Sequence, residues 1–533
     1  MKKNLVLILM VVSTVVFAQK KQQLPDIKSS INRVEVWFNG GYNDWTFENE
    51  SSTWNMFSVT KKYVDVKIKT DLDSVEFKSK KNQLTAINII HGNDTLKYSV
   101  NLTDKFENTL SDAKKLYLLG YFWSEAKYNF AFFDKLKFNW DSLYTAYIPK
   151  VINTKNDFEF YRQMELFACS LKDLHTGSYY ENESDYTKFI PMTAKYFGND
   201  LYIVSSYSKA DLPPVKSKIL KINDLPIEEY IQKEVVPFIN SDFEPIVKSM
   251  SASKLFSSDL VTKKMKITYQ TPDNQILTKT LSRYEGGDIG ERIGYTPKYS
   301  LKPIEIEWQK DNIALLKFNT FNSLYEELIP MFDKMKDTLY SAKGIIIDLR
   351  NNRGGGTDVA LHLLQHIIKD KYFLTYAYQT RINDGVKRAT GNFIEENADF
   401  LNNKAFQTFL PDTIYIPDSI KQFTCPVVVL SSNNTCSAAE DFLIMLKERP
   451  DRPLFIGQPT MGSTGSPLVL WDFPANAWAR ICTRRVLYPY SLKPYTEGIY
   501  PDIQVDYTID EFMSQEVDKE VEIAIKELKK MIK

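Results

Sequence analysis

The segment between Pro426 and Pro450 constrains the fold of this chain more than any other, because it changes secondary structure within a few residues. Residues 427–430 are all apolar and predict a strand that is buried on both faces. A polar loop follows over residues 431–436. From Ser437 onward apolar residues recur at helical spacing, and a helix has to end before Pro450. The segment therefore predicts a strand, a loop and a helix, which is the repeating unit of an α/β domain.

Two similar units precede this segment. A strand is predicted over residues 313–318 with a helix over 325–339, and a second strand over 344–349 with a helix over 357–368. The second strand runs into a turn with consecutive glycines at 354–356, whose backbone N–H groups can face an anion. The turn has neither the GxxxxGK[ST] nor the GxGxxG spacing of nucleotide-binding loops, so donation to an oxyanion remains open.

The pattern changes along the rest of the chain and predicts a multidomain α+β protein. Residues 19–105 alternate between polar and apolar and predict an N-terminal β domain, and residues 106–187 have helical spacing. Strands return over residues 188–295, where the stretch 219–231 looks like part of a PDZ domain, although a plain β-rich connector is an alternative. The α/β units place a C-terminal α/β domain over residues 296–533.

The first eighteen residues differ from the rest of the chain and predict a secretory signal peptide over residues 1–18. Two lysines precede an apolar run over residues 5–17, and Ala18 stands before Gln19. The run is too short to cross about 30 Å of hydrocarbon as a helix. We therefore expect an exported protein, periplasmic or secreted, with no stable membrane insertion; a retained N-terminal anchor is the alternative.

Charge and metal-ligand patterns narrow the function classes. Lys and Arg together number 67, as do Asp and Glu, so no basic excess suggests nucleic acid as a partner. The four cysteines have no metal-binding spacing, and their pairing stays open. His362 and His366 stand four residues apart, but a leucine occupies the place of the glutamate in HExxH metalloproteases. We therefore interpret both as ordinary helix residues and expect no metal and no cofactor.

Ser437 is the candidate centre of chemistry. A serine where a strand passes into a helix lies among unpaired N–H groups at the positive end of the helix dipole, which suits an oxygen nucleophile. Residues 437–440 also spell a capping box, in which the serine only satisfies those N–H groups. A serine nucleophile needs a base, and His175, at the end of the helical region, is one of only four histidines in the chain.

With these pieces placed, the chain resembles the C-terminal processing (tail-specific) family of serine peptidases. The resemblance rests on five stretches that occur in the family's order. These stretches are Leu174-His175-Thr176, residues 347–355 (IDLRNNRGG), residues 436–440 (CSAAE), residues 457–462 and residues 497–502 (EGIYPD).

One position separates the branches of that family. Enzymes of the processing type carry a lysine base directly after the Thr-x-Gly of the fourth stretch, and this chain has Ser463 there. The tricorn-core-like branch instead uses a histidine and a glutamate near the C-terminal end, and His175 and Glu497 stand in the matching positions. Tricorn has a serine directly before its histidine, where this chain has Leu174.

The resemblance implies a peptidase that acts on peptides or unfolded proteins. It implies Ser437 as nucleophile, His175 as general base and Glu497 as the group that orients the imidazole. It also implies an oxyanion hole made by the N–H groups of Gly354 and Ala438. Because an unperturbed histidine titrates near about pH 6.5, activity is expected to fall away in acid.

Two alternatives remain at this stage. The thiol of Cys436 is a possible nucleophile beside Ser437, since thiolates are intrinsically stronger nucleophiles. The other alternative is a catalytically inactive protein that binds a peptide or a small ligand in the same groove. The joint presence of Ser437, His175 and Glu497 favours the enzyme.

Overall fold

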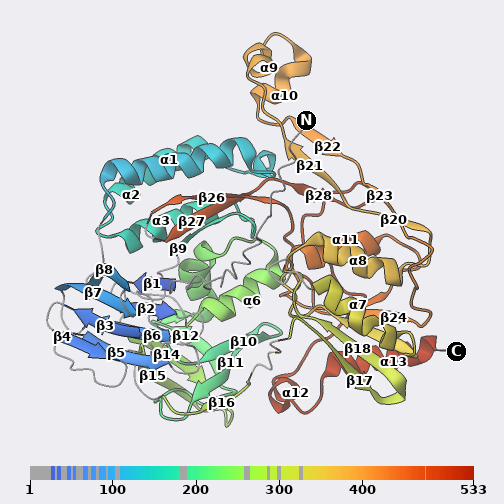
Figure 1. Ribbon diagram of the computed structural model, residues 1–533, viewed down its shortest axis with the longest axis horizontal. Helices are drawn as coiled ribbons and strands as arrows, with labels where there is room; N and C mark the ends of the chain where they lie inside the picture. Colours follow the sequence, from blue (N-terminus) through green and yellow to red (C-terminus); the bar gives the residue numbers. More distant parts are fainter. Residues whose placement is uncertain are drawn as a thin grey trace, which may run out of the picture. The chain divides into compact units, whose positions relative to one another are not determined.

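The computed structural model describes residues 109–180, 189–256, 264–284, 289–296, 300, 302–322, 328–474 and 476–532, together with the backbone of strands between Asp26 and Leu102 (Figure 1). The chain divides into two compact units, residues 1–107 and residues 108–533. The signal peptide predicted over residues 1–18 lies outside the described residues. No helix in the described part is long and apolar enough to cross a membrane.

The first unit contains two antiparallel sheets, of the kind expected for the β domain predicted over residues 19–105. Their strand orders are β1-β2-β6-β5 and β4-β3-β7-β8. The strands are β1 (Asp26–Ser30), β2 (Arg33–Trp37), β3 (Trp45–Asn49), β4 (Ser52–Asn55), β5 (Val64–Lys69), β6 (Ser74–Ser79), β7 (Gln83–His91) and β8 (Asp94–Leu102).

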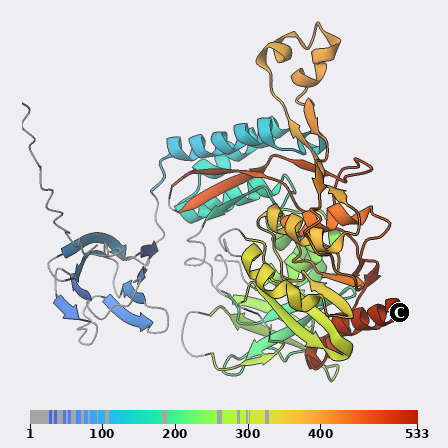
Figure 2. The ribbon, with the colours of Figure 1, turned by 45° about the vertical axis from the view of Figure 1, so that its right-hand side comes forward.

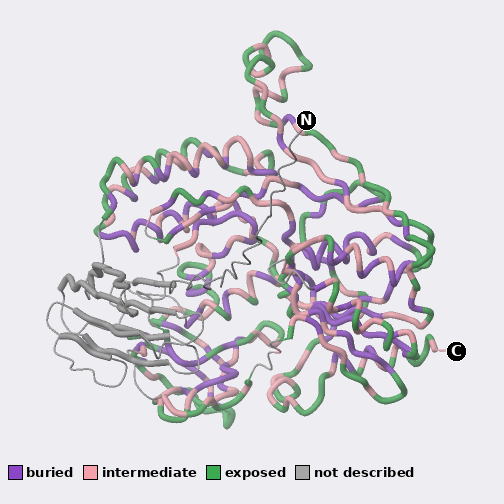
Figure 3. The backbone as a smooth tube through the Cα atoms, viewed as in Figure 1, coloured by how far each residue is buried: buried purple, intermediate pink, exposed green. Residues whose placement is uncertain are grey.

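A mostly parallel sheet of order β17-β18-β19-β24-β25-β29 forms the centre of the second unit. β17 pairs antiparallel with β18, and the remaining neighbours are parallel. Every residue of β19 is buried, as its apolar sequence predicts. Figure 3 shows buried backbone in purple in the region of this sheet. The strands are β17 (Ile304–Gln309), β18 (Ile313–Phe318), β19 (Gly344–Asp348), β24 (Val427–Ser431), β25 (Leu454–Gly457) and β29 (Ile503–Gln504).

Helices cover both faces of this sheet (Figure 1). One face packs against α7 (Leu328–Leu339), α8 (Thr357–Ile367) and α11 (Ala438–Lys447) through a single apolar core. The other face packs against α13 (Lys519–Met531), which buries Val521, Ala524 and Leu528 there. The α/β domain predicted from the repeated strand–loop–helix units is therefore present.

The C-terminal segment, residues 509–532, belongs to this second unit. The segment forms two helices, α12 (Ile509–Ser514) and α13, because Gln515 adopts a left-handed conformation with φ of 49° and Asp518 caps the second helix. α13 is also held to the sheet, since Arg350 donates to Asp518 and to the buried carboxylates of Asp348 and Glu520.

The helical region does not have a core of its own. The helices α1 (Asp112–Asn129), α2 (Trp140–Ile152) and α3 (Asp157–Cys169) share one apolar cluster with β26 (Pro467–Phe473) and β27 (Ala477–Cys482). β27 also pairs with β9 (Gly177–Tyr180), which directly follows the helical region. The helical region predicted over residues 106–187 therefore lacks the β26–β27 hairpin that completes its core. The sequence pattern did not reveal this partner because the hairpin lies far along the chain, at residues 467–482.

The segment predicted as PDZ-like, residues 188–295, forms an antiparallel sheet of order β10-β11-β12-β14-β15. Asn223 and Asp224, with φ of 48° and 67°, make the predicted turn between β12 and β13. Its relation to PDZ domains stays a prediction. The elements are β10 (Thr193–Phe197), β11 (Asp200–Tyr207), β12 (Lys218–Ile222), β13 (Leu225–Pro226), α5 (Ile227–Tyr230), α6 (Glu244–Lys254), β14 (Lys264–Gln270), β15 (Ile276–Ser282) and β16 (Arg292–Gly294).

An insertion between α8 and β24 extends from this unit. Its helices α9 and α10 project away from the remainder of the unit in both ribbon views (Figures 1 and 2). The elements are β20 (Tyr372–Leu374), β21 (Ala377–Arg381), α9 (Gly385–Thr390), α10 (Ala398–Leu401), β22 (Phe406–Phe409) and β23 (Thr413–Tyr415), with β28 (Arg485–Leu487) pairing β21.

Candidate active site

The loops that follow β19, β24 and β25 meet at one edge of the sheet. Because these strands are parallel, their carboxyl ends lie together, which is where open α/β sheets form their sites. The loops carry Gly354, Ser437 and Ser463. The Ser437 N–H donates to the carbonyl of Ser463 at 3.0 Å. A Cβ atom on Gly354 would lie 2.6 Å from Ser437 Cβ, so only glycine, here at φ of 93°, allows this approach.

Ser437 occupies a strained turn between β24 and α11. Its backbone has φ of 56° and ψ of −127°, a conformation that costs a residue with a side chain about 1–3 kcal/mol. Residues 437–440 form the predicted capping box, in which the Glu440 carboxylate accepts the Ser437 N–H at 3.2 Å. The hydroxyl of Ser437 also lies 3.2 Å from Nε2 of His175, a contact that the capping box does not require.

The side chain of His175 lies between two serines. Its Nε2 is 3.2 Å from Ser437 Oγ, and its Nδ1 is 2.5 Å from Ser463 Oγ. The structure thus brings together the histidine and the serine that the sequence singled out, although the helical region and the α/β domain supply them separately.

Hydrogen bonds to the backbone fix the loop that carries His175. Asp173 Oδ1 accepts the His175 N–H at 3.0 Å and the hydroxyl of Thr176 at 2.8 Å. Arg480, on β27, donates to the carbonyl of Leu174 at 2.7 Å. These contacts fix the main chain of the loop. The orientation of the imidazole ring depends on the contacts of its two nitrogens with Ser437 and Ser463.

Burial keeps the imidazole neutral. The pKa of His175 is lowered to about 3, first by burial and then by the positive charge of Arg480. Among the described residues, no carboxylate lies within hydrogen-bonding distance of the ring. The arrangement that suits a base is then Nδ1–H donating to Ser463 Oγ, which leaves Nε2 free to accept the Ser437 proton.

Glu497, predicted to orient this imidazole, does not contact it. Its side chain is exposed, and its carboxylate makes no hydrogen bond to a described residue. Only the backbone of its segment reaches the site, since Gly462 and Gly498 approach each other closely and Ile499 N–H donates to Thr460 Oγ1 at 2.8 Å. Ser463, at the position of the processing-type lysine, takes the place that the resemblance gave to Glu497.

Glu440 is the residue whose importance sequence reasoning missed. Its buried carboxylate accepts the N–H groups of Ser437 at 3.2 Å, Gly462 at 2.6 Å and Ser463 at 2.9 Å, and the hydroxyl of Tyr495 at 2.5 Å. Burial raises its pKa to about 7. In the sequence it is the N3 residue of a capping box, and that pattern does not indicate that its carboxylate also binds a second loop.

The two predicted oxyanion donors differ in availability. The Ala438 N–H, in the first turn of α11, has no acceptor among the described residues. The Gly354 N–H donates to Asn352 Oδ1 at 2.9 Å, so it is occupied in this structure. One donor is therefore ready beside Ser437, and the other requires the Asn352 amide to turn or to share its hydrogen bond.

Comparison with known proteins gives the family of this part of the chain. Residues 312–505 match the sequence profile of Peptidase family S41. Residues 312–505 form a peptidase S41 domain. The chain is a serine-type peptidase. The match includes Ser437, Ser463 and Glu440, whereas His175 lies outside it.

Solved structures agree with this fold. Mature CPAF is similar with a TM-score of 0.59 and 14% sequence identity, over 79% of this chain and 98% of that chain. Mature CPAF complexed with lactacystin is similar with a TM-score of 0.58 and 14% identity, over 78% of this chain and 98% of that one. At this identity the likeness concerns the fold alone. No curated protein matches the sequence.

Cys436, the alternative nucleophile, directly precedes Ser437, but its surroundings do not favour a thiolate. The residue is buried, and burial raises the pKa of its thiol well above the usual value. Its Sγ donates to the carbonyl of Ser463 at 3.3 Å. All four cysteines are free thiols in the structure.

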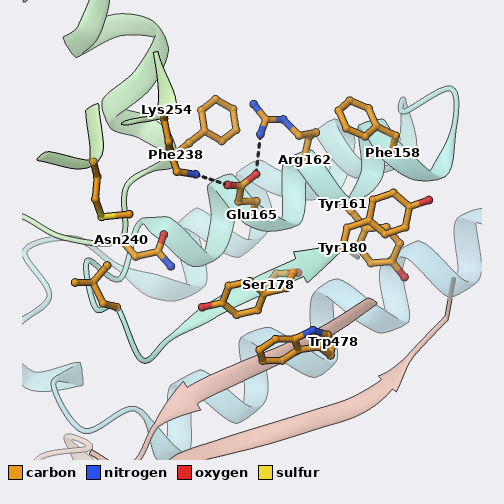
Figure 4. A pocket seen from close by; sticks show the side chains of 13 residues that line it. Phe158, Tyr161, Arg162, Glu165, Ser178, Tyr180, Phe238, Asn240, Lys254 and Trp478 are labelled. Carbon is orange, nitrogen blue, oxygen red and sulfur yellow. Dashed lines mark hydrogen bonds and ion pairs between the residues drawn. The ribbon is translucent and has the colours of Figure 1, made fainter. Parts of the chain in front are cut away.

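Leu174, the residue before His175, lines a pocket of about 430 Å³. Figure 4 shows this pocket from close by. The pocket combines aromatic walls with a charged cluster in which Glu165 binds Arg162 at 2.8 Å and Lys254 at 3.3 Å. Its lining residues are Phe158, Tyr161, Arg162, Glu165, Leu174, Ser178, Tyr179, Tyr180, Phe238, Asn240, Met250, Lys254 and Trp478.

The neutral His175 predicts a specific dependence of stability on pH. A histidine in the unfolded chain titrates near about pH 6.5, whereas His175 in the folded protein has a pKa of about 3. Its contribution to stability is complete above the first value and is lost as pH falls toward the second, because only the unfolded state binds the proton there.

We expect the free energy of unfolding of the wild type to fall relative to that of His175→Gln between about pH 7 and about pH 4. Denaturant unfolding of both proteins across this range measures the difference. The pair is matched, since the raised pKa values of Glu440 and Asp441 are common to both. A difference that does not change with pH would contradict the buried neutral state.

Proposed function

We propose that this serine-type peptidase hydrolyses peptide bonds through an acyl-enzyme on Ser437, with His175 as general base. The observation that carries the proposal is the 3.2 Å contact between Nε2 of a neutral imidazole and Oγ of a serine on a strained strand-to-helix turn. This pairing corresponds to the Ser/His branch of the resemblance and not to the Ser/Lys branch, since Ser463 stands at the lysine position.

In the proposed reaction, Ser437 Oγ attacks the peptide carbonyl while its proton passes to His175 Nε2. The Ala438 N–H stabilises the oxyanion, and Gly354 N–H joins it when Asn352 releases that donor; one such donor is typically worth about 10²–10³ in rate. His175 then protonates the leaving amine as the C–N bond breaks. A water molecule, deprotonated by His175, hydrolyses the ester and restores Ser437.

We further propose that the substrates are peptides or unfolded proteins. The pocket that Leu174 lines supports this, because a residue adjacent to the base lines a space of side-chain dimensions. Its aromatic lining favours an apolar or aromatic substrate side chain.

The first test concerns the nucleophile and the base. Ser437→Ala and His175→Ala are each expected to abolish hydrolysis of an unfolded protein, since each removes one end of the proton transfer. A fluorophosphonate is expected to label the wild type and not Ser437→Ala, whereas iodoacetamide leaves the wild-type activity intact. Circular dichroism of each variant checks that it remains folded.

Either of two outcomes would contradict this assignment. Full hydrolysis by Ser437→Ala would show another nucleophile. A folded wild type that neither labels nor hydrolyses would favour the alternative of an inactive binding protein on the same fold, for which the occupied Gly354 N–H is the one supporting observation.

A second test separates Ser463 from Glu497 as the group that orients His175. Ser463→Ala removes the hydroxyl on Nδ1 and keeps the backbone groups of residue 463, so kcat is expected to fall about 10–100-fold with little change in KM. Glu497→Gln is the matched control and is expected to retain kcat, because its carboxylate is exposed. The reverse pattern would return the orienting role to Glu497.

We also propose that the protein is exported, on the basis of its N-terminal lysines, apolar run and small residue at position 18. Expression of the full chain in a bacterium with an export pathway is expected to yield a mature protein that begins at Gln19. N-terminal sequencing checks this. A cytoplasmic product that retains Met1 would refute the proposal.

A further inference from the structure

A second cluster of chemically active side chains lies between α7 and α8, apart from the Ser437 residues. Asp333 on α7 and His362 and His366 on α8 each offer one ligand atom, and these atoms lie within 4.8 Å of one another. The two histidines are four residues apart and so share one face of α8. Asp333 reaches them because α7 and α8 pack side by side in the same core.

The hydrogen bonds of His366 prepare one of its nitrogens for a metal. Its Nδ1 lies 2.8 Å from the carbonyl oxygen of Lys421 and 3.1 Å from the hydroxyl of Tyr340. Because that hydroxyl donates to the same carbonyl oxygen, Nδ1 carries the proton and donates it. Its Nε2 then has a lone pair, is buried, and has no partner among the described residues. A backbone carbonyl on one ring nitrogen fixes the tautomer and leaves the other nitrogen for a metal, as in many protein metal sites.

The other two groups are already in contact. His362 Nε2 lies 2.9 Å from Asp333 Oδ1, and the ammonium of Lys336 lies 2.6 Å from the same oxygen. Two donors on one carboxylate oxygen mark a place where positive charge is favourable. A divalent cation here would displace the Lys336 ammonium and the Nε2 proton of His362.

We infer that Asp333, His362 and His366 form a binding site for one divalent transition-metal ion of the Zn²⁺ type, which joins α7 to α8. Two imidazoles and a carboxylate suit Zn²⁺, which accepts these ligands in a tetrahedral arrangement and takes water as the fourth. The ligand atoms need to be roughly 3.3–3.5 Å apart, given bonds of about 2.0–2.2 Å. Side chains of His362 and Asp333 are 20% and 38% exposed, so both have room to move by that amount.

The sequence alone predicted no metal site at these histidines. His362 and His366 were interpreted as ordinary helix residues because no glutamate follows His362. The third ligand comes from another helix, 29 residues earlier in the chain than His362. The three residues are not among those that contact Ser437, so the inference does not depend on hydrolysis by Ser437.

The test is titration of the metal-free full chain with Zn²⁺ in competition with a chromophoric chelator. We expect one equivalent to bind, and the affinity to fall at least about 10-fold in Asp333→Asn and in His362→Gln. Both substitutions lie at partly exposed side chains, which keeps the core intact, whereas His366→Gln would disturb a buried residue. His175→Gln is the matched histidine control and is expected to bind as the wild type does.

Two further measurements complete the design. Zn²⁺ is expected to raise the melting temperature of the wild type and not of Asp333→Asn, since an ion that binds only the folded state stabilises it. Lys336→Gln is expected to bind Zn²⁺ several-fold more tightly, because the competing ammonium is gone. Absence of binding at 100 µM Zn²⁺, equal binding in Asp333→Asn and His362→Gln, or no gain in Lys336→Gln would each overturn the assignment.

Discussion

The buried carboxylate of Glu440 is the group on which the geometry of the active site depends. It accepts N–H groups from the loop after β24 and from the loop after β25, and so fixes Ser437 and Ser463 relative to each other. Burial raises the pKa of Glu440 to about 7, because the ionised form is poorly solvated inside the protein. The hydrogen bonds that it accepts act in the opposite direction and stabilise the ionised form. Among the described residues, the two side-chain contacts of the His175 ring are both with serine hydroxyl groups.

His175 faces hydroxyl groups where a serine peptidase with a full triad would place a carboxylate on one side. A carboxylate stabilises the imidazolium that forms during acyl transfer, whereas a hydroxyl only orients the ring. The charge of Arg480 adds to this disadvantage, since it lowers the pKa of His175 along with burial. The imidazole of His175 is therefore neutral at the pH values at which an unperturbed histidine titrates. The fall in activity near about pH 6.5 that the sequence predicts for an unperturbed histidine is therefore not expected from His175.

The sequence predicted the scaffold more closely than the contacts within the site. The strand predicted over residues 313–318 is β18 (Ile313–Phe318), and the helix predicted over 357–368 is α8 (Thr357–Ile367). These limits were accessible because apolar runs end sharply at polar or glycine-rich turns. Ser437 and His175 were found through short motifs. Ser463 and Asp333 were not, because the direction of a side chain depends on loops and helices that pack from elsewhere in the chain. Glu497 was misplaced for the same reason: its backbone matches the family stretch while its side chain points to solvent.

One stretch of chain, residues 458–482, explains how distant parts reach a common site. It leaves β25, supplies Ser463 to the imidazole, and then forms the β26–β27 hairpin that completes the core of the helical region. β27 pairs with β9, where Arg480 lies opposite Gly177, two residues after His175, and the same arginine binds the carbonyl of Leu174. The segment that contacts His175 therefore also pairs with the strand that follows His175. Both contacts belong to one continuous segment, residues 458–482, so a shift of this segment would affect the imidazole and Ser463 together. The distance between His175 and Ser437 therefore depends on packing across the second unit and not on one loop alone.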